Sequence, residues 1–133
     1  EVKGPKGTRK FTATDDVMVD RVFLVAPSSP AERIEKVAQV SNGFVYAAST
    51  MGVTGTRTQV SVDAQDLVQR TKALTSQPVC VGLGVSTPEQ AAEVAEYADG
   101  VIVGSAFIKA LETGGTRGLS ALVADLARGV RRA

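Results

Sequence analysis

The chain has 133 residues, about the length of one domain, and 44% of them are apolar, so it can bury a core without help from metals or disulfides. Fifteen basic and fourteen acidic side chains leave a formal charge of +1, which is too small to indicate a nucleic-acid or membrane partner. Histidine is absent, which excludes Ser-His and Cys-His nucleophiles and imidazole metal sites.

Cysteine usage and hydropathy indicate the compartment. The single cysteine, Cys80, cannot form an internal disulfide, as expected in a reducing compartment. The sequence shows neither an apolar run of about 18 residues nor a signal-peptide pattern. We therefore expect a cytoplasmic protein without a membrane partner.

Residues 1–20 stand apart from the rest of the chain. The string VKGPKGT predicts a β-hairpin that turns between Gly4 and Gly7. Over about residues 1–12 it resembles a hairpin of a bacterial large-subunit ribosomal protein. Four basic side chains there could contact phosphate: Lys3, Lys6, Arg9 and Lys10. We favour a solvated hairpin with charged edges over RNA binding, so a ribosome- or RNA-associated chimera is kept only as an alternative.

From Arg21 onward, short β-rich apolar runs alternate with helical patterns, which predicts βαβ units and a parallel sheet. The first strand is expected at residues 22–25. The string S-P-A-E that starts at Ser29 has the pattern of a capping box, with proline at the first helical position.

The second strand is expected at residues 44–47. A glycine- and threonine-rich loop from residue 48 to about 61 then leads to a helix with Asp63 as its N-cap. The expected inner stripe of this helix is Leu67, Val68, Thr71 and Leu74.

The third and fourth strands are expected at residues 79–81 and 101–103, with a helix near Pro88 between them. A short helical piece at residues 105–111 and a flexible stretch at 113–116 come before the last helix. The side chains expected to share one face of that last helix are Leu119, Leu122, Val123, Leu126 and Val130.

The spacing of the units indicates the architecture. Four units share residues 21–133, roughly 28 residues each, and eight such units fill a (β/α)8 TIM barrel of about 250 residues. We therefore predict an α/β fold, the C-terminal half of such a barrel, preceded by the hairpin of residues 1–20. Four βα units alone do not exclude an open doubly wound sheet.

Two glycine-bearing turns follow consecutive strands: Gly82-Leu83-Gly84 and Gly104-Ser105. Glycine lets backbone N–H groups approach phosphate, and a helix N-terminus adds a partial positive charge. Phosphate sites built from the last two strand-to-helix loops recur in TIM barrels. We therefore predict phosphate binding at these turns rather than glycines that only permit tight packing.

A strand-end tyrosine and a long glycine-hinged loop make the most specific pattern. The strings APSSPAERI, GFVYAASTMGVTGTR, VCVGLGVSTPEQA and DGVIVGSAFIKAL resemble the C-terminal half of the tryptophan synthase alpha subunit, over about residues 20–133. The glycine turns are shared with other phosphate-binding barrels, whereas Tyr46 and the GVTG loop narrow the resemblance to this family.

The resemblance implies a lyase that cleaves indole-3-glycerol phosphate to indole and glyceraldehyde 3-phosphate without a cofactor, and a beta subunit as partner. It implies that Tyr46 lies near the glycerol moiety and that Thr54 orients a catalytic carboxylate. The positions that match phosphate-binding residues are Gly82, Leu83, Gly84, Gly104 and Ser105. Thr50 stands where many members carry a basic residue.

This reaction needs a carboxylate pair, which the family takes from the first half of its barrel. No such pattern occurs in this sequence, and its acids fall mostly on helix faces. We therefore expect a chain that is inactive alone. Two alternatives stay open: a non-catalytic phosphate-binding half-barrel, and the RNA-associated chimera. The half-barrel would leave its outer sheet edges unpaired, which leaves three explanations open: two copies associate as a homo-oligomer, the N-terminal hairpin covers one edge, or the rest of the barrel lies in another chain or outside this sequence.

Overall fold

The structure is a computed structural model, and it describes residues 2–4, 7–9, 19–49 and 57–131. Near the N-terminus, β1 (Val2–Gly4) pairs antiparallel with β2 (Gly7–Arg9), so the predicted hairpin is confirmed. The other described strands form one four-stranded sheet in the order β3-β4-β5-β6. Their bounds are Leu24–Val25 for β3, Val45–Ala48 for β4, Val79–Gly82 for β5 and Gly100–Ile102 for β6.

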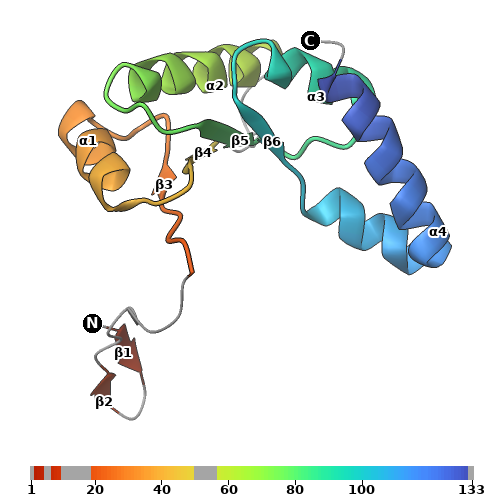
Figure 1. Ribbon diagram of the computed structural model, residues 1–133, viewed down its shortest axis with the longest axis horizontal. Coiled ribbons are helices and arrows are strands. Elements are labelled where there is room, and N and C mark those ends of the chain that lie inside the picture. Colours follow the sequence, from red (N-terminus) through yellow and green to blue (C-terminus); the bar gives the residue numbers. More distant parts are fainter. Residues whose placement is uncertain (1, 5–6, 10–18, 50–56, 132–133) are drawn as a thin grey trace.

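All neighbouring strands of the larger sheet are parallel, and their spatial order is their order in the chain. Right-handed crossovers between sequential parallel strands place every connecting helix on the same face of a sheet. Figure 1 shows the helices arranged around one side of the strands, with α1 beside β3 and α4 at the opposite end. The helices are α1 (Ala31–Val40), α2 (Arg57–Lys72), α3 (Pro88–Ala95) and α4 (Ser105–Val130). This is the predicted half of a β/α barrel, not a doubly wound sheet.

The two faces of the sheet differ in burial because successive side chains point to opposite sides. On β4 and β5 the helix-facing side chains are buried, whereas Tyr46 and Cys80 on the other face are only half-buried. Leu24, which pairs with Tyr46 on that face, is 57% exposed. The buried apolar residues form one cluster: Val25, Ile34, Ala38, Val45, Ala47, Ala64, Leu67, Val68, Val79, Val81, Val85, Ala91, Val94 and Leu126.

The start of α1 differs from the prediction. Pro30 is the N-cap and makes no side-chain cap hydrogen bond, so the capping box expected at Ser29 is wrong. The Ser29 hydroxyl instead accepts a hydrogen bond from the Ala26 N–H at 2.9 Å. Ser29 therefore closes the turn before the helix.

The start of α2 differs as well, because the helix begins at Arg57 and Asp63 lies inside it rather than at its N-cap. Residues 57–62 carry three β-branched residues, which disfavour a helix on propensity alone. Further along the helix, Leu67 and Val68 are fully buried, as expected for its inner stripe. Leu74 follows the helix and is 40% exposed, so its place in the inner stripe was wrong.

The last helix is broken where the sequence predicts a flexible stretch. Gly115 has a φ of +60° inside α4, and Figure 1 shows the two parts at a sharp angle. The first part of α4 extends beyond residue 111, where the short helical piece was predicted to end. On the second part Leu126 is buried, whereas Val123 is 43% exposed, so the predicted apolar face is not buried along its whole length. Within the described residues, no helix has the length and hydropathy needed to cross a bilayer.

Gly129 provides a test of how α4 packs on α3. A Cβ at this buried position would lie 2.9 Å from the Pro88 Cα and carbonyl carbon, and closer still to its oxygen. We expect Gly129→Ala to lower the free energy of unfolding by about 1–3 kcal/mol, measured by urea denaturation. Gly114→Ala is the matched control, because a Cβ there meets nothing within 4 Å, and it should leave stability unchanged or slightly raised. Equal effects of the two changes would contradict this packing.

Candidate functional site

The two predicted glycine turns lie at the same edge of the sheet. β5 and β6 are hydrogen-bonded in parallel, with Gly82 opposite Ile102, so both strands end on the same side. Gly84 and Gly104, which follow these ends, are both exposed. The carboxyl edge of a parallel sheet is where ligands of α/β proteins bind.

The β5 turn is shaped by Tyr46 of β4. A Cβ on Gly82 would lie 2.6 Å from the Tyr46 Cζ and would overlap its hydroxyl, so the phenol ring lies directly over this glycine. The Gly82 carbonyl accepts a hydrogen bond from the Ser49 N–H at 3.0 Å, which holds the turn to the end of β4. Gly84 has a φ of +73°, a conformation that other residues rarely adopt.

The β6 turn leads into α4 without a side-chain cap. Gly104 is the N-cap, and its carbonyl accepts hydrogen bonds from the N–H groups of Phe107 and Ile108 at 3.0 and 3.2 Å. The N–H groups of Ser105 and Ala106 precede these first helical bonds. They lie at the positive end of the helix dipole, which favours an anion.

The neighbouring helix α3 is capped by its own side chains. The Thr87 hydroxyl accepts from the Gln90 N–H at 3.3 Å, and Gln90 Oε1 accepts from the N–H groups of Thr87 and Ser86 at 3.3 and 2.8 Å. This capping box was not predicted, although T-P-E-Q carries its sequence pattern. Of the two helices that start near the glycine turns, α3 therefore has a side-chain cap and α4 has none.

Cys80 lies on the same face as Tyr46 but is not poised as a nucleophile. Its sulfur is 2.7 Å from the position that a Cβ on Gly100 would take. Burial, and secondarily the negative charge of Asp99, raises the pKa of the thiol above its ordinary value. The thiol therefore stays protonated near neutral pH, and a protonated thiol is a weak nucleophile.

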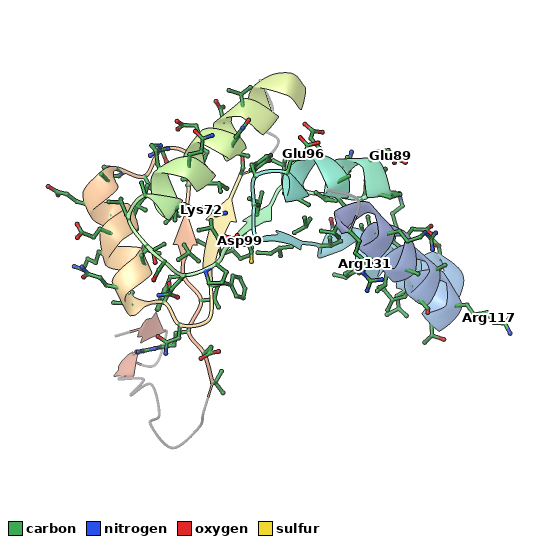
Figure 2. All side chains as sticks on the ribbon, turned by 45° about the horizontal axis from the view of Figure 1, so that its top comes forward. Lys72, Glu89, Glu96, Asp99, Arg117 and Arg131 are labelled. Atoms are coloured by element: carbon green, nitrogen blue, oxygen red, sulfur yellow. The ribbon has the colours of Figure 1, made fainter. Side chains whose placement is uncertain are left out.

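Asp99 is held by a structural ion pair, not presented to the site. Its carboxylate accepts hydrogen bonds at 2.9 Å from Lys72 Nζ and from the Val79 N–H, at the amino end of β5. Burial alone would raise its pKa, but the Val79 hydrogen bond and the bond and charge of Lys72 outweigh it, so the pKa is lowered. Figure 2 shows Lys72 and Asp99 facing each other away from α4.

The other described acids agree with the expectation of solvated helix faces. Glu89 and Glu96 are exposed and point outward from α3 in Figure 2. Asp66 and Asp125 pair with Arg70 and Arg128 of their own helices. Within residues 19–49 and 57–131, no three His, Cys, Asp or Glu side chains gather as a metal would require. Thr54 and Thr50 lie outside the described residues.

Comparison with known proteins assigns the family. The sequence profile described as "Tryptophan synthase alpha chain" matches residues 7–129. The chain belongs to the tryptophan synthase alpha family. The alpha chain of Streptomyces coelicolor is 60% identical to it over 115 residues, which cover 83% of this chain and 42% of the relative. The alpha chain of Acidothermus cellulolyticus is 58% identical over 125 residues, covering 92% of this chain and 47% of the relative.

Solved structures give the same result. Mycobacterium tuberculosis tryptophan synthase matches with a TM-score of 0.74 and 57% identity, over 85% of this chain and 42% of that one. The alpha subunit from Legionella pneumophila matches with a TM-score of 0.68 and 29% identity. The chain spans less than half the length of these curated relatives. The predicted boundary near residue 20 and the likeness of residues 1–12 to a ribosomal hairpin stay predictions.

Two contacts that shape this edge were missed from the sequence. The fit of Tyr46 over Gly82 depends on strand register, which the sequence alone does not provide. Arg70 of α2 donates hydrogen bonds at 3.0 Å to the carbonyls of Pro27 and Ser29, which fixes the loop between β3 and α1. An arginine within a helix carries no sequence signal for such a distant contact.

A double-mutant cycle tests the contact of Tyr46 with Gly82. We expect Gly82→Ala to lower the free energy of unfolding by about 1–3 kcal/mol, because the added methyl group overlaps the phenol ring. In a Tyr46→Ala background this overlap is gone, and the same change should cost about 1–2 kcal/mol less, measured by urea denaturation. Additive effects of the two substitutions would show that the ring does not lie over Gly82.

Proposed function

We propose that the turns at Gly82-Leu83-Gly84 and Gly104-Ser105 bind the phosphate of a glycerol phosphate ligand. The observation that carries this proposal is the parallel pairing of β5 with β6, which brings both turns to one edge beside the uncapped start of α4. Neutral N–H groups and a helix dipole suit a dianion. The nearest basic residue in sequence, Lys109, is exposed on α4.

The family assignment supports indole-3-glycerol phosphate as the ligand. Tyr46 extends over Gly82, next to the proposed phosphate position, where it would flank the glycerol moiety. By resemblance, whole family members cleave this substrate with a beta subunit as partner, and Thr54 orients a catalytic carboxylate. We extend the beta-subunit contact and the role of Thr54 to this protein as part of the proposal.

We further propose that these residues bind the ligand without cleaving it. Cleavage needs an acid and a base at the indole and glycerol ends of the substrate. Among the described residues, Asp99 lies at the other edge of the sheet and the helix acids face solvent. An acid and a base would therefore have to come from residues outside the described part of the chain.

Phosphate binding is tested by titrating the chain with glycerol 3-phosphate and following backbone amide resonances. We expect shifts at Gly82, Gly84, Gly104 and Ser105. Ser105→Glu should weaken binding at least about tenfold, because a carboxylate at this position repels the dianion. The matched control is Ser120→Glu, which adds the same charge at an exposed position in the second part of α4. Equal weakening by both variants, or no shifts at the two turns, would refute the site.

The absence of cleavage is tested by measuring indole release from indole-3-glycerol phosphate. We expect the chain alone to release no more indole than a Tyr46→Ala, Ser105→Glu double variant, which lacks both proposed ligand contacts. Release above the level of that variant would show that the sequence holds its own acid and base.

A further inference from the structure

Asp99, the residue directly before β6, is joined to Val79 at the start of β5 by two hydrogen bonds. Its backbone N–H donates to the Val79 carbonyl, and its carboxylate Oδ2 accepts from the Val79 N–H, both at 2.9 Å. The second carboxylate oxygen, Oδ1, accepts a hydrogen bond at 2.9 Å from Lys72 Nζ at the end of α2. Asp99 therefore links α2, β5 and β6 at the amino edge of the sheet (Figure 2).

The pairing of β5 with β6 at this edge determines which residues meet at the opposite edge. Gly82 pairs with Ile102, and the glycines Gly84 and Gly104 each follow by two residues, so the observed register aligns the two glycine turns. A slip of one residue would shift the turns relative to each other by about 3.3 Å, which exceeds the length of an N–H···O hydrogen bond, about 2.9 Å. After such a slip, N–H groups of the two turns would no longer converge on one phosphate.

The apolar residues of β6 do not specify this register by themselves. Val101, Ile102 and Val103 follow one another, so a slip of one residue still places an apolar side chain on each face of the sheet. The hydrophobic pattern fixes the register of a strand only where it distinguishes the two faces. Other residues must therefore select the observed pairing.

Gly100 and Asp99 provide this selection. A Cβ at Gly100 would lie 2.7 Å from the Cys80 sulfur, so a slip that brought Val101 opposite Cys80 would produce a clash. A slip in either direction would also separate the Asp99 carboxylate from the Val79 N–H that it binds. The glycine excludes one alternative sterically, and the carboxylate favours the observed register by its hydrogen bond.

We propose that Asp99 is a positioning residue: its bonds to Val79 at the amino edge fix the register that aligns Gly84 with Gly104 at the carboxyl edge. Single polar residues fix register in coiled coils, where one buried asparagine selects the alignment of the helices. Lys72 balances the charge of the carboxylate but adds little to the alignment, because both side chains of this ion pair are 40% exposed. The consequence for ligand binding rests on the proposed phosphate site, whereas the register does not.

Cross-strand NOEs and titration with glycerol 3-phosphate test the role of Asp99 in the 133-residue chain. A Cys80→Ala background removes the steric exclusion, so the register there depends chiefly on the carboxylate. In this background Asp99→Ala should remove the NOEs that report the pairing of Gly82 with Ile102, and should raise the dissociation constant at least about tenfold. Asp99→Asn should keep the NOEs and stay within about threefold of the background affinity, because its side-chain oxygen still accepts from the Val79 N–H.

The matched control is Asp125→Ala, which removes a carboxylate that pairs with Arg128 within α4. It should leave the NOEs and the dissociation constant at their background values. A role of Asp99 in stability alone would lower the urea midpoint of Asp99→Ala but leave both readouts unchanged. Circular dichroism shows whether each variant is folded. If the alanine variant does not fold, Asp99→Ser takes its place with the same expectations, since its hydroxyl ends one bond short of the carboxylate oxygens.

The two readouts separate this inference from the proposed function. A parent chain that does not bind glycerol 3-phosphate would refute the phosphate site, and the NOEs would still test Asp99. A folded Asp99→Ala variant that keeps the background NOEs would overturn the positioning role, even if the parent binds the ligand. Loss of these NOEs in that variant, with their return in Asp99→Asn, would support it.

Discussion

The parallel hydrogen-bonded pairing of β5 with β6 is the constraint on which the candidate site depends. Cys80, Val81 and Gly82 pair in order with Gly100, Val101 and Ile102, so the two strands run side by side and end together. An antiparallel pairing would have sent the two glycine turns to opposite edges. The Ser49 amide continues the ladder past Gly82 and ties the end of β4 into the same edge.

Small and large residues alternate across the open face of this sheet. The phenol ring of Tyr46 fits over Gly82, and the sulfur of Cys80 fits beside Gly100. In both pairs the glycine leaves space that the larger neighbour on the adjacent strand fills. The position of the Tyr46 phenol therefore depends on the glycine at residue 82 of the neighbouring strand as well as on Tyr46 itself.

Much of the architecture could be predicted from the sequence because continuous valine-rich runs mark buried parallel strands. The break at Gly115 was visible in the Gly-Gly pair of residues 114 and 115. Helix starts were harder to predict, because Ser29 and Asp63 have the chemistry of caps but are used in a turn and within a helix. Local pattern does not reveal which of several capping residues the tertiary packing selects.

The candidate site could be predicted in part, because some of its features are visible in the local sequence. Glycine turns after strands are a local feature, and the structure places Gly82-Leu83-Gly84 and Gly104-Ser105 at one edge. The contact of Tyr46 with Gly82 depends on strand register, which cannot be read from residue spacing.

Because α3 and α4 are capped differently, the electrostatic potential at the carboxyl edge of the sheet is more positive near the start of α4. At the start of α3 the Thr87 hydroxyl accepts a hydrogen bond from the Gln90 N–H, whereas α4 follows Gly104, which has no side chain to cap it. In the proposed binding mode, a doubly charged group would lie toward the β6 end of this edge, and the uncharged remainder of the same molecule would lie above the phenol of Tyr46. The two helix starts would then set the direction in which the ligand lies.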